Sequence, residues 1–155
     1  MTKIFSVICL LLVSSHINAA MGLDYIRENY DKAVSDKNLC KTMIEELKPK
    51  QNNTVYLAYL GGLQTIWANH TINPISKLNT FNEGKKNIEK AVNDEPNNIE
   101  IRFVRLSVQK NTPSFLGYNH QIKEDEHFLK NNRHHVVSPV LLKLINELLN
   151  TKDTP

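Results

Sequence analysis

The chain has 155 residues, of which 19 are lysine or arginine and 16 are aspartate or glutamate, so its formal net charge is +3 with neutral histidines. Charges of both signs are interspersed, so the sequence lacks the strong basic patch of a nucleic-acid-binding protein, and we expect no nucleic-acid partner. The sequence contains no glycine-rich phosphate loop, paired-cysteine metal motif or serine elbow. We therefore expect no cofactor and no enzymatic activity.

Residues 1–19 have the layout of a secretory signal peptide. Lys3 supplies a positive start, residues 4–13 form an apolar run, and small Ala19 ends a short polar stretch. The run is too short to span a bilayer comfortably, and an uncleaved amino-terminal anchor is the alternative. We predict cleavage after Ala19, export to the periplasm or the cell exterior, and no membrane span in the mature chain.

A single helical domain is expected over residues 20–150, followed by a disordered tail over residues 151–155. A chain of this length can enclose a real hydrophobic core. Cleavage leaves Cys40 as its only cysteine, so no internal disulfide can form and stability must come from packing.

Two helices that form an antiparallel pair are predicted for the start of the mature chain. Apolar residues at helical spacing indicate a first helix over residues 23–34. A second helix begins after Asp36, its N-cap, and ends before Pro49.

The next segment, residues 54–70, is apolar on nearly every side, as expected of a helix buried among several neighbours. Gly61 and Gly62 each cost a helix interior about 1 kcal/mol relative to alanine. Either a neighbouring helix approaches closely at these glycines, or the helix kinks there.

Capping signals divide the middle of the chain. Asn73, followed by Pro74, starts a short helical segment. Thr80 and Glu83 then form a capping box, which predicts the start of a separate helix. That helix must end before Pro96, because a proline disfavours the helical conformation in the residue before it.

The segment over residues 101–118 is predicted to begin inside a helix. That helix starts a few residues earlier, where Asn97 and Glu100 resemble a capping box. Two of its sides are apolar, which suits an inner helix that touches both neighbours. Alternating apolar residues at its start also permit a strand, which we reject because helices flank the segment and no partner strand is evident.

Two further helices complete the chain. Asn119 is expected to cap a largely polar helix that ends near residue 132. Ser138 and Pro139 form a strong cap and first turn for the last helix, whose apolar face over residues 139–149 is a candidate surface for self-association.

The hairpin organisation resembles tetratricopeptide repeats, which carry bulky and small residues at fixed positions of two helices and close on a proline. Gly61 and Gly84 are about eleven residues further apart than in a standard repeat, and we assign the extra residues to a lengthened connection over residues 69–79. The order of motifs also looks like a group of small exported bacterial proteins with no assigned activity. The residues that match the tetratricopeptide pattern are Leu57, Leu60, Gly61, Gly84, Ile88, Ala91 and Pro96.

The resemblance implies an all-α fold, a short stack of antiparallel helical hairpins with about seven helices. Such stacks offer concave surfaces for protein partners. The leading hypothesis is therefore an exported, non-enzymatic protein- or peptide-binding or scaffolding module. This function follows from analogy between folds.

Arg102, Arg105 and Gln109 share one side of their predicted helix and are candidate ligand-binding residues. Two arginines can clamp a carboxylate in a groove. Alternatively, their stems cover apolar surface while their guanidinium groups pair with Glu100, Glu124 or helix-end carbonyls. Surface and structural pairing is the usual fate of arginine, so we favour the alternative.

The connector after this helix carries Phe115, Leu116 and Tyr118, which need burial because they are large and apolar or aromatic. Folding back over the end of the preceding helix would bury them. If they are instead exposed, they form an apolar patch suited to a partner.

A metal- or ligand-binding protein is the alternative hypothesis. His120 and Glu124 are one helical turn apart, and Glu124 and His127 have the spacing of helix-borne di-iron ligands. The sequence holds only one copy of this motif, whereas such sites use two, so a solvated acidic face is the favoured interpretation.

Overall fold

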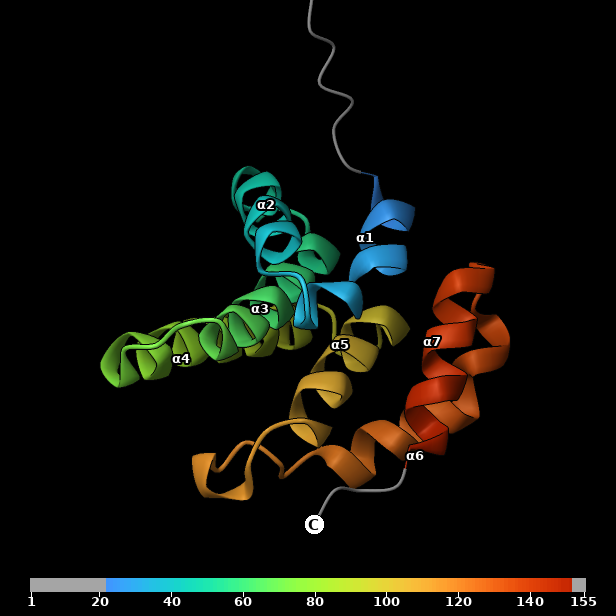
Figure 1. Cartoon of the computed structure of the whole chain (residues 1–155). Helices are drawn as coiled ribbons and strands as arrows, with labels where there is room; N and C mark the ends of the chain where they lie inside the picture. The colour runs from blue at the N-terminus through green and yellow to red at the C-terminus, as the bar shows by residue number, and fades with distance from the viewer. Residues whose placement is uncertain (1–21, 152–155) are drawn as a thin grey trace, which may run out of the picture.

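A computed structural model describes residues 22–151 of the chain as an all-α fold (Figure 1). Seven α-helices in this range pack mostly as adjacent antiparallel pairs, and no strand occurs within it. The predicted fold class is therefore confirmed. The predicted signal peptide and residues 152–155 of the predicted tail lie outside the described residues. The helices are α1 (Leu23–Asn29), α2 (Lys37–Leu47), α3 (Thr54–Asn69), α4 (Pro74–Asp94), α5 (Ile99–Lys110), α6 (Ile122–Asn132) and α7 (Pro139–Asn150).

Four short 3-10 helices join these elements: η1 (Lys32–Val34), η2 (Lys48–Lys50), η3 (Ser114–Leu116) and η4 (Arg133–His135). Over residues 22–151, no helix combines the length and the apolar character needed to cross a membrane.

Two of the predicted helix starts are confirmed by their hydrogen bonds. The Asp36 carboxylate accepts a hydrogen bond from the Leu39 amide at 2.9 Å, which caps α2. The Ser138 hydroxyl accepts one from the Leu141 amide at 3.3 Å, which caps α7. Each side chain satisfies an amide that has no partner within its own helix.

The predicted separate helix after Thr80 is wrong, because α4 runs without a break from Pro74 to Asp94. Asn73 accepts hydrogen bonds from the amides of Ile75 and Ser76, so the helix already has a complete start. No proline or strained residue interrupts the following turns, and the local capping signal is therefore overridden. Of residues 69–79, which we assigned to a lengthened connection, residues 74–79 instead belong to α4, and residues 70–73 connect the two helices.

Three other predicted boundaries also need correction. The first helix ends at Asn29, and a separate 3-10 helix, η1, covers Lys32–Val34, so no single helix runs to residue 34. Asn98, not Asn97, caps α5 by accepting from the amides of Glu100 and Ile101. α6 begins at Ile122 without a side-chain cap, so Asn119 does not have its predicted role.

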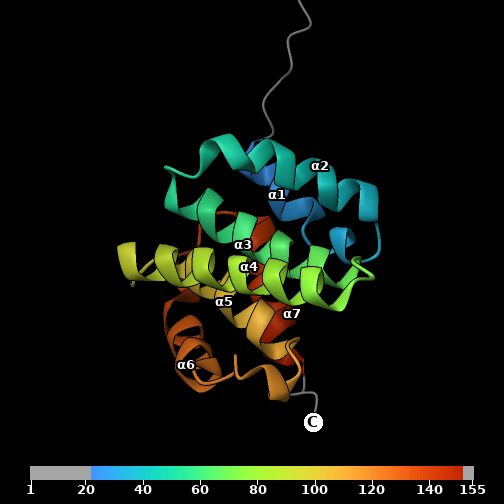
Figure 2. The ribbon, with the colours of Figure 1, turned by 90° about the vertical axis from the view of Figure 1, so that its left-hand side faces the viewer.

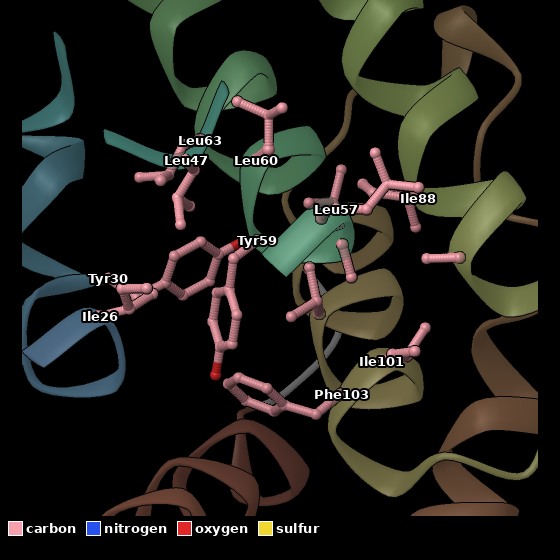
Figure 3. Packing of buried hydrophobic residues seen from close by; sticks show 14 of the residues in the cluster. Ile26, Tyr30, Leu47, Leu57, Tyr59, Leu60, Leu63, Ile88, Ile101 and Phe103 are labelled. Atoms are coloured by element: carbon pink, nitrogen blue, oxygen red, sulfur yellow. The ribbon is translucent and has the colours of Figure 1, made fainter. Parts of the chain in front are cut away.

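The core is built around α3, which is buried on most of its sides as predicted. Tyr59 on this helix makes an edge contact with the ring of Tyr30, whose ring also meets Phe103 of α5 (Figure 3). These three rings join α3 to the amino-terminal segment and to α5. Cys40 is fully buried, and burial raises the pKa of its thiol to about 12.

The close approach predicted at the glycines of α3 is confirmed. A β-carbon added to Gly61 would lie 2.5 Å from the carbonyl oxygen of Gly84, and one added to Gly84 would lie 2.5 Å from the carbonyl oxygen of Gly61. The two glycines therefore allow α3 and α4 to run side by side in direct backbone contact (Figure 2). The space beside Gly62 is occupied by the hydroxyl of Tyr30.

Candidate functional site

The two arginines of α5 point into the protein, toward a buried carboxylate of α6. Arg105 donates from Nε and Nη2 to the two oxygens of Asp125, at 2.7 Å and 2.8 Å, in a bidentate pair. The exposed fraction of Asp125 is 0%. Burial raises the pKa of this carboxyl group, and the hydrogen bonds from Arg105 oppose that rise.

Arg102 lies one helical turn before Arg105 on α5 and also approaches Asp125. Its Nη2 donates to Glu124 Oε1 at 2.6 Å, and its Nε lies 2.6 Å from Asp125 Oδ1 without the alignment of a hydrogen bond. Its guanidinium also lies over the ring of Phe128, 4.9 Å from the centroid. Both arginines are thus matched by carboxylates of α6, which leaves less reason to expect a ligand carboxylate at them.

Glu89 of α4 extends the same network. Tyr118 donates its hydroxyl proton to Glu89 Oε1 at 2.6 Å, and Arg105 Nη1 lies 3.3 Å from Glu89 Oε2. Burial and this hydrogen bond raise the pKa of Tyr118. We call the six residues Glu89, Arg102, Arg105, Tyr118, Glu124 and Asp125 the Asp125 cluster.

Gln109 is buried as well, and it donates to the side-chain oxygen of Gln121 at 2.8 Å. Four of the five predicted ligand residues are therefore buried and have protein partners. They are Arg102, Arg105, Gln109 and Tyr118. The fifth, Phe115, differs from all of them, with an exposed fraction of 84%.

The three metal-ligand candidates do not come together as the spacing suggested. His120 precedes α6, so it is not one helical turn from Glu124. Glu124 is engaged by Arg102, and His127 Nε2 lies 2.8 Å from Asn131 Nδ2. Within residues 22–151, no group of three or more His, Cys, Asp or Glu side chains is arranged to hold a metal ion.

A second, partly buried ion pair ties α1 to α5. Arg27 donates from Nε and Nη2 to the two oxygens of Glu100, both at 2.7 Å, and Tyr59 donates to Glu100 Oε1 at 2.8 Å. Glu100 is therefore not the partner of the α5 arginines, which was one of our expectations. This pair borders a shallow hollow of about 670 Å³ between α1, the start of α5 and the start of α7.

A larger groove, of about 840 Å³, opens on another side of the molecule. Its walls come from η1, the second half of α3, the start of α4, and the end of α5 with the connector that follows it. We call it the Phe115 groove. Its lining residues are Tyr30, Asp31, Val34, Thr65, Ile66, Ala68, Asn69, Pro74, Lys77, Leu78, Phe81, Ser107, Val108, Asn111, Thr112, Pro113, Phe115 and Leu116.

The rim of the Phe115 groove is apolar and exposed. Val34, Leu78 and Phe115 line the groove and are all exposed to solvent. Ile72 and Ile75 continue the apolar surface at the end of the α3–α4 hairpin, which lies on the same side of the molecule as η3 (the left of Figure 1). The burial that we expected for Phe115 therefore does not occur, and our alternative of an exposed apolar patch holds.

Two charged residues also line the groove, one of each sign. Asp31 and Lys77 form no ion pair with another described residue. Burial raises the pKa of Asp31, Glu147 raises it further, and Lys143 lowers it. The groove thus combines a large apolar surface with one acidic and one basic group.

The apolar face of α7 packs mainly within the chain. Leu141 and Ile145 are buried, and Leu144, Leu148 and Leu149 are half-buried against the core. Self-association through residues 139–149 stays a prediction, but the most exposed apolar side chains lie elsewhere.

Some of these features were not found from the sequence, although it carried signals for them. Asp125 shares a helix face with Ile122 and Leu129, so its position on an apolar stripe indicated a buried carboxylate. Ile75 and Leu78 follow the cap at Asn73 at helical spacing, and their exposure depends on how far the α3–α4 hairpin projects. That projection is a tertiary feature, which the local sequence does not encode.

Comparisons of the chain with protein-family models, with curated proteins and with solved structures find no match in any of the three.

Proposed function

We propose that this chain is an exported, non-enzymatic binding module that takes an apolar segment of a protein into the Phe115 groove. The single observation that carries the proposal is the exposure of Phe115, at 84%, beside an open groove of about 840 Å³. A large apolar side chain held in water beside a hollow is unfavourable unless a partner covers it.

The polar groups of the groove support a protein ligand over a purely apolar one. Ser107, Asn69, Asn111 and Thr112 line the groove together with the apolar residues. Protein interfaces combine an apolar centre with polar groups that fix the orientation of the partner. A polypeptide segment offers both kinds of contact along one chain.

Export and the relation to tetratricopeptide repeats belong to the same proposal. The amino-terminal sequence supports export, as argued above. The contact between Gly61 and Gly84 is the kind of close helix approach that small residues permit in helical-hairpin repeats, and it supports a lengthened hairpin of that type. Repeats of this type present protein-binding surfaces.

Site-specific photo-crosslinking in the exporting cell tests the proposal. A benzoylphenylalanine replaces Phe115 in one variant and Val137 in a control variant, since Val137 is apolar and 94% exposed but lies outside the Phe115 groove. We expect a discrete protein adduct from position 115 and none from position 137. The adduct should also disappear when Leu78→Ser is added, because Leu78 lines the same groove.

Mass spectrometry of the adduct identifies the protein that occupies the groove. Equal crosslinking at positions 115 and 137, or an adduct that is insensitive to Leu78→Ser, would contradict the proposal.

A further inference from the structure

The exposed apolar residues of this chain are gathered on one side. Seven large apolar side chains within residues 22–151 are exposed, and five of them line or flank the Phe115 groove. The five are Val34, Ile72, Ile75, Leu78 and Phe115. The other two, Tyr25 and Val137, lie outside its lining. A partner of the groove must therefore cover projecting side chains as well as fill a hollow.

The same surface contains a projection and a hollow side by side. Phe115 stands out from η3, while the groove that it borders is open. A ligand that only fills the hollow would leave Phe115 and Ile75 in water. A surface of the same shape, turned by a two-fold rotation, presents its own projection to the hollow and its own hollow to the projection.

The two charged residues of the Phe115 groove also suit a two-fold contact. Asp31 and Lys77 have opposite signs and line one groove, and neither forms a salt bridge with another described residue. Within the chain, Lys143 and Glu147 of α7 act on the pKa of Asp31 in opposite directions. In a two-fold contact, when residue i meets residue j of the partner, residue j also meets residue i. One acid and one base are therefore enough to make two ion pairs, so the groove is complementary in charge to a copy of itself.

From this shape and charge we propose that the partner in the Phe115 groove is a second copy of this chain. In the resulting two-fold dimer, Phe115 of each copy enters the groove of the other, and Asp31 of each copy pairs with Lys77 of the other. This inference rests on the proposed function, because it requires the groove to bind protein.

The oligomeric state of the full chain, expressed with its own amino-terminal segment, gives the first test. Sedimentation and light scattering from about 1 µM to about 1 mM cover the range of weak and moderate interfaces. We expect the mass to rise from one chain to two. Phe115→Ser should lower the association constant more than about tenfold, because aromatic side chains at the centre of an interface supply much of its binding energy. The control Val137→Ser should leave the association constant unchanged.

Charge reversal gives the sharper test. In Asp31→Lys, residues 31 and 77 are both positive, and in Lys77→Asp they are both negative, so each variant should dimerise more than about tenfold less well than wild type. An equal mixture of the two variants should dimerise again, because every contact then joins opposite charges. An unrelated protein in the groove would give no such recovery. Circular dichroism confirms that each variant is folded before its mass is measured.

The outcomes separate this inference from the proposed function. A wild-type chain that stays monomeric up to about 1 mM, or a dimer indifferent to Phe115→Ser, overturns the inference. So does a mixture of folded charge variants that remains monomeric. If the chain is monomeric and position 115 still crosslinks to a different protein, the inference fails and the proposed function stands. If position 115 crosslinks to nothing, both fail.

Discussion

The Asp125 cluster and the Phe115 groove both use the segment over residues 101–118, yet they invert the usual distribution of side chains. In the cluster, the charged groups of Arg102, Arg105 and Asp125 are buried, with Asp125 at 0% exposure, and each has an oppositely charged partner. In the groove, Phe115 is apolar and 84% exposed. A polar group that is buried and satisfied already has its partners inside the protein, whereas an exposed aromatic ring does not.

This difference between paired charges and an exposed ring indicates which residues are structural and which are available to a partner. The arginines are charged residues in an apolar segment, but their carboxylate partners on α4 and α6 account for their positions. They hold three helices together. The connector, by contrast, carries Phe115, a large apolar side chain that the fold leaves exposed.

The strongest test of this contrast is the removal of the buried carboxylate. Asp125→Ala leaves the buried Arg105 without its bidentate partner and Arg102 with Glu124 alone, and breaking a buried ion pair in this way costs about 3–5 kcal/mol. We expect the free energy of unfolding to fall by that amount in urea titrations followed by circular dichroism.

Glu124→Ala is the matched control, because Glu124 is the neighbouring acid and its side chain is 60% exposed. Exposed ion pairs contribute about 0–1 kcal/mol, so its effect should be small. Equal effects of the two variants would mean that the buried carboxylate contributes no more to stability than the exposed one.

A change at the α3–α4 contact should disturb both the Asp125 cluster and the Phe115 groove. The reason is that α4 supplies Glu89 to the cluster and Leu78 to the groove. In Gly61→Ala the added β-carbon meets the Gly84 carbonyl oxygen and the Ile88 side chain. Overpacking of this kind costs about 1–3 kcal/mol. We expect a matching loss of unfolding free energy in the same titrations.

Asn82→Ala, an exposed position on α4, provides the control and should change stability by less than about 0.5 kcal/mol. A neutral Gly61→Ala would contradict the direct backbone contact between the helices.

Local patterns in the sequence were sufficient to predict the helical fold. The caps at Asp36 and Ser138 follow from local chemistry, because an oxygen beside free amides will accept a hydrogen bond wherever the rest of the chain lies. The burial of α3 follows from its apolar composition. The helix start predicted at Thr80 is wrong, because a continuous α4 packed against α3 is more stable than a helix interrupted by a new start.

The candidate site was only partly predictable. The side of α5 that carries Arg102 and Arg105 could be deduced from helical spacing, but their partners on α6 depend on the arrangement of helices in space. Phe115 was identified as a residue that is either buried or part of a patch, and the local sequence could not decide between these. The groove itself draws on four separate parts of the chain, so no single segment indicates it.

A smaller effect is expected from the tyrosine at the edge of the Asp125 cluster. Tyr118→Phe removes the hydrogen bond to Glu89, which should cost about 1 kcal/mol below pH 10. The pKa of Tyr118 is raised in the folded state, so above pH 10 the unfolded chain loses this proton while the folded chain keeps it. The stability that Tyr118 contributes should therefore decline as the pH rises above 10.

Thermal unfolding of wild type and Tyr118→Phe between pH 8 and pH 11 measures this decline as a shrinking difference in stability. Tyr25→Phe is the control, since Tyr25 is exposed and lies outside the cluster. A difference that stays constant or grows above pH 10 would show that Tyr118 ionises at least as readily in the folded chain as in the unfolded one.

The smallest effect on stability should come from the residue that we consider most important for binding. Phe115→Ser removes a side chain that makes little contact with its own fold, so the unfolding free energy should change by less than about 0.5 kcal/mol when measured at a concentration where the chain is monomeric. The fluorescence of an added apolar dye should fall, because the variant exposes less apolar surface beside the groove.

The combination of these two results is what separates Phe115 from Asp125. Asp125→Ala should lower stability strongly, and it removes no apolar surface from the Phe115 groove. Phe115→Ser should do the reverse, because a side chain already in water contributes little to folding but loses all the apolar area it could bury against a partner. A large loss of stability in Phe115→Ser would mean that the ring packs against its own chain in solution, and the connector would then be structural in the same sense as the arginines.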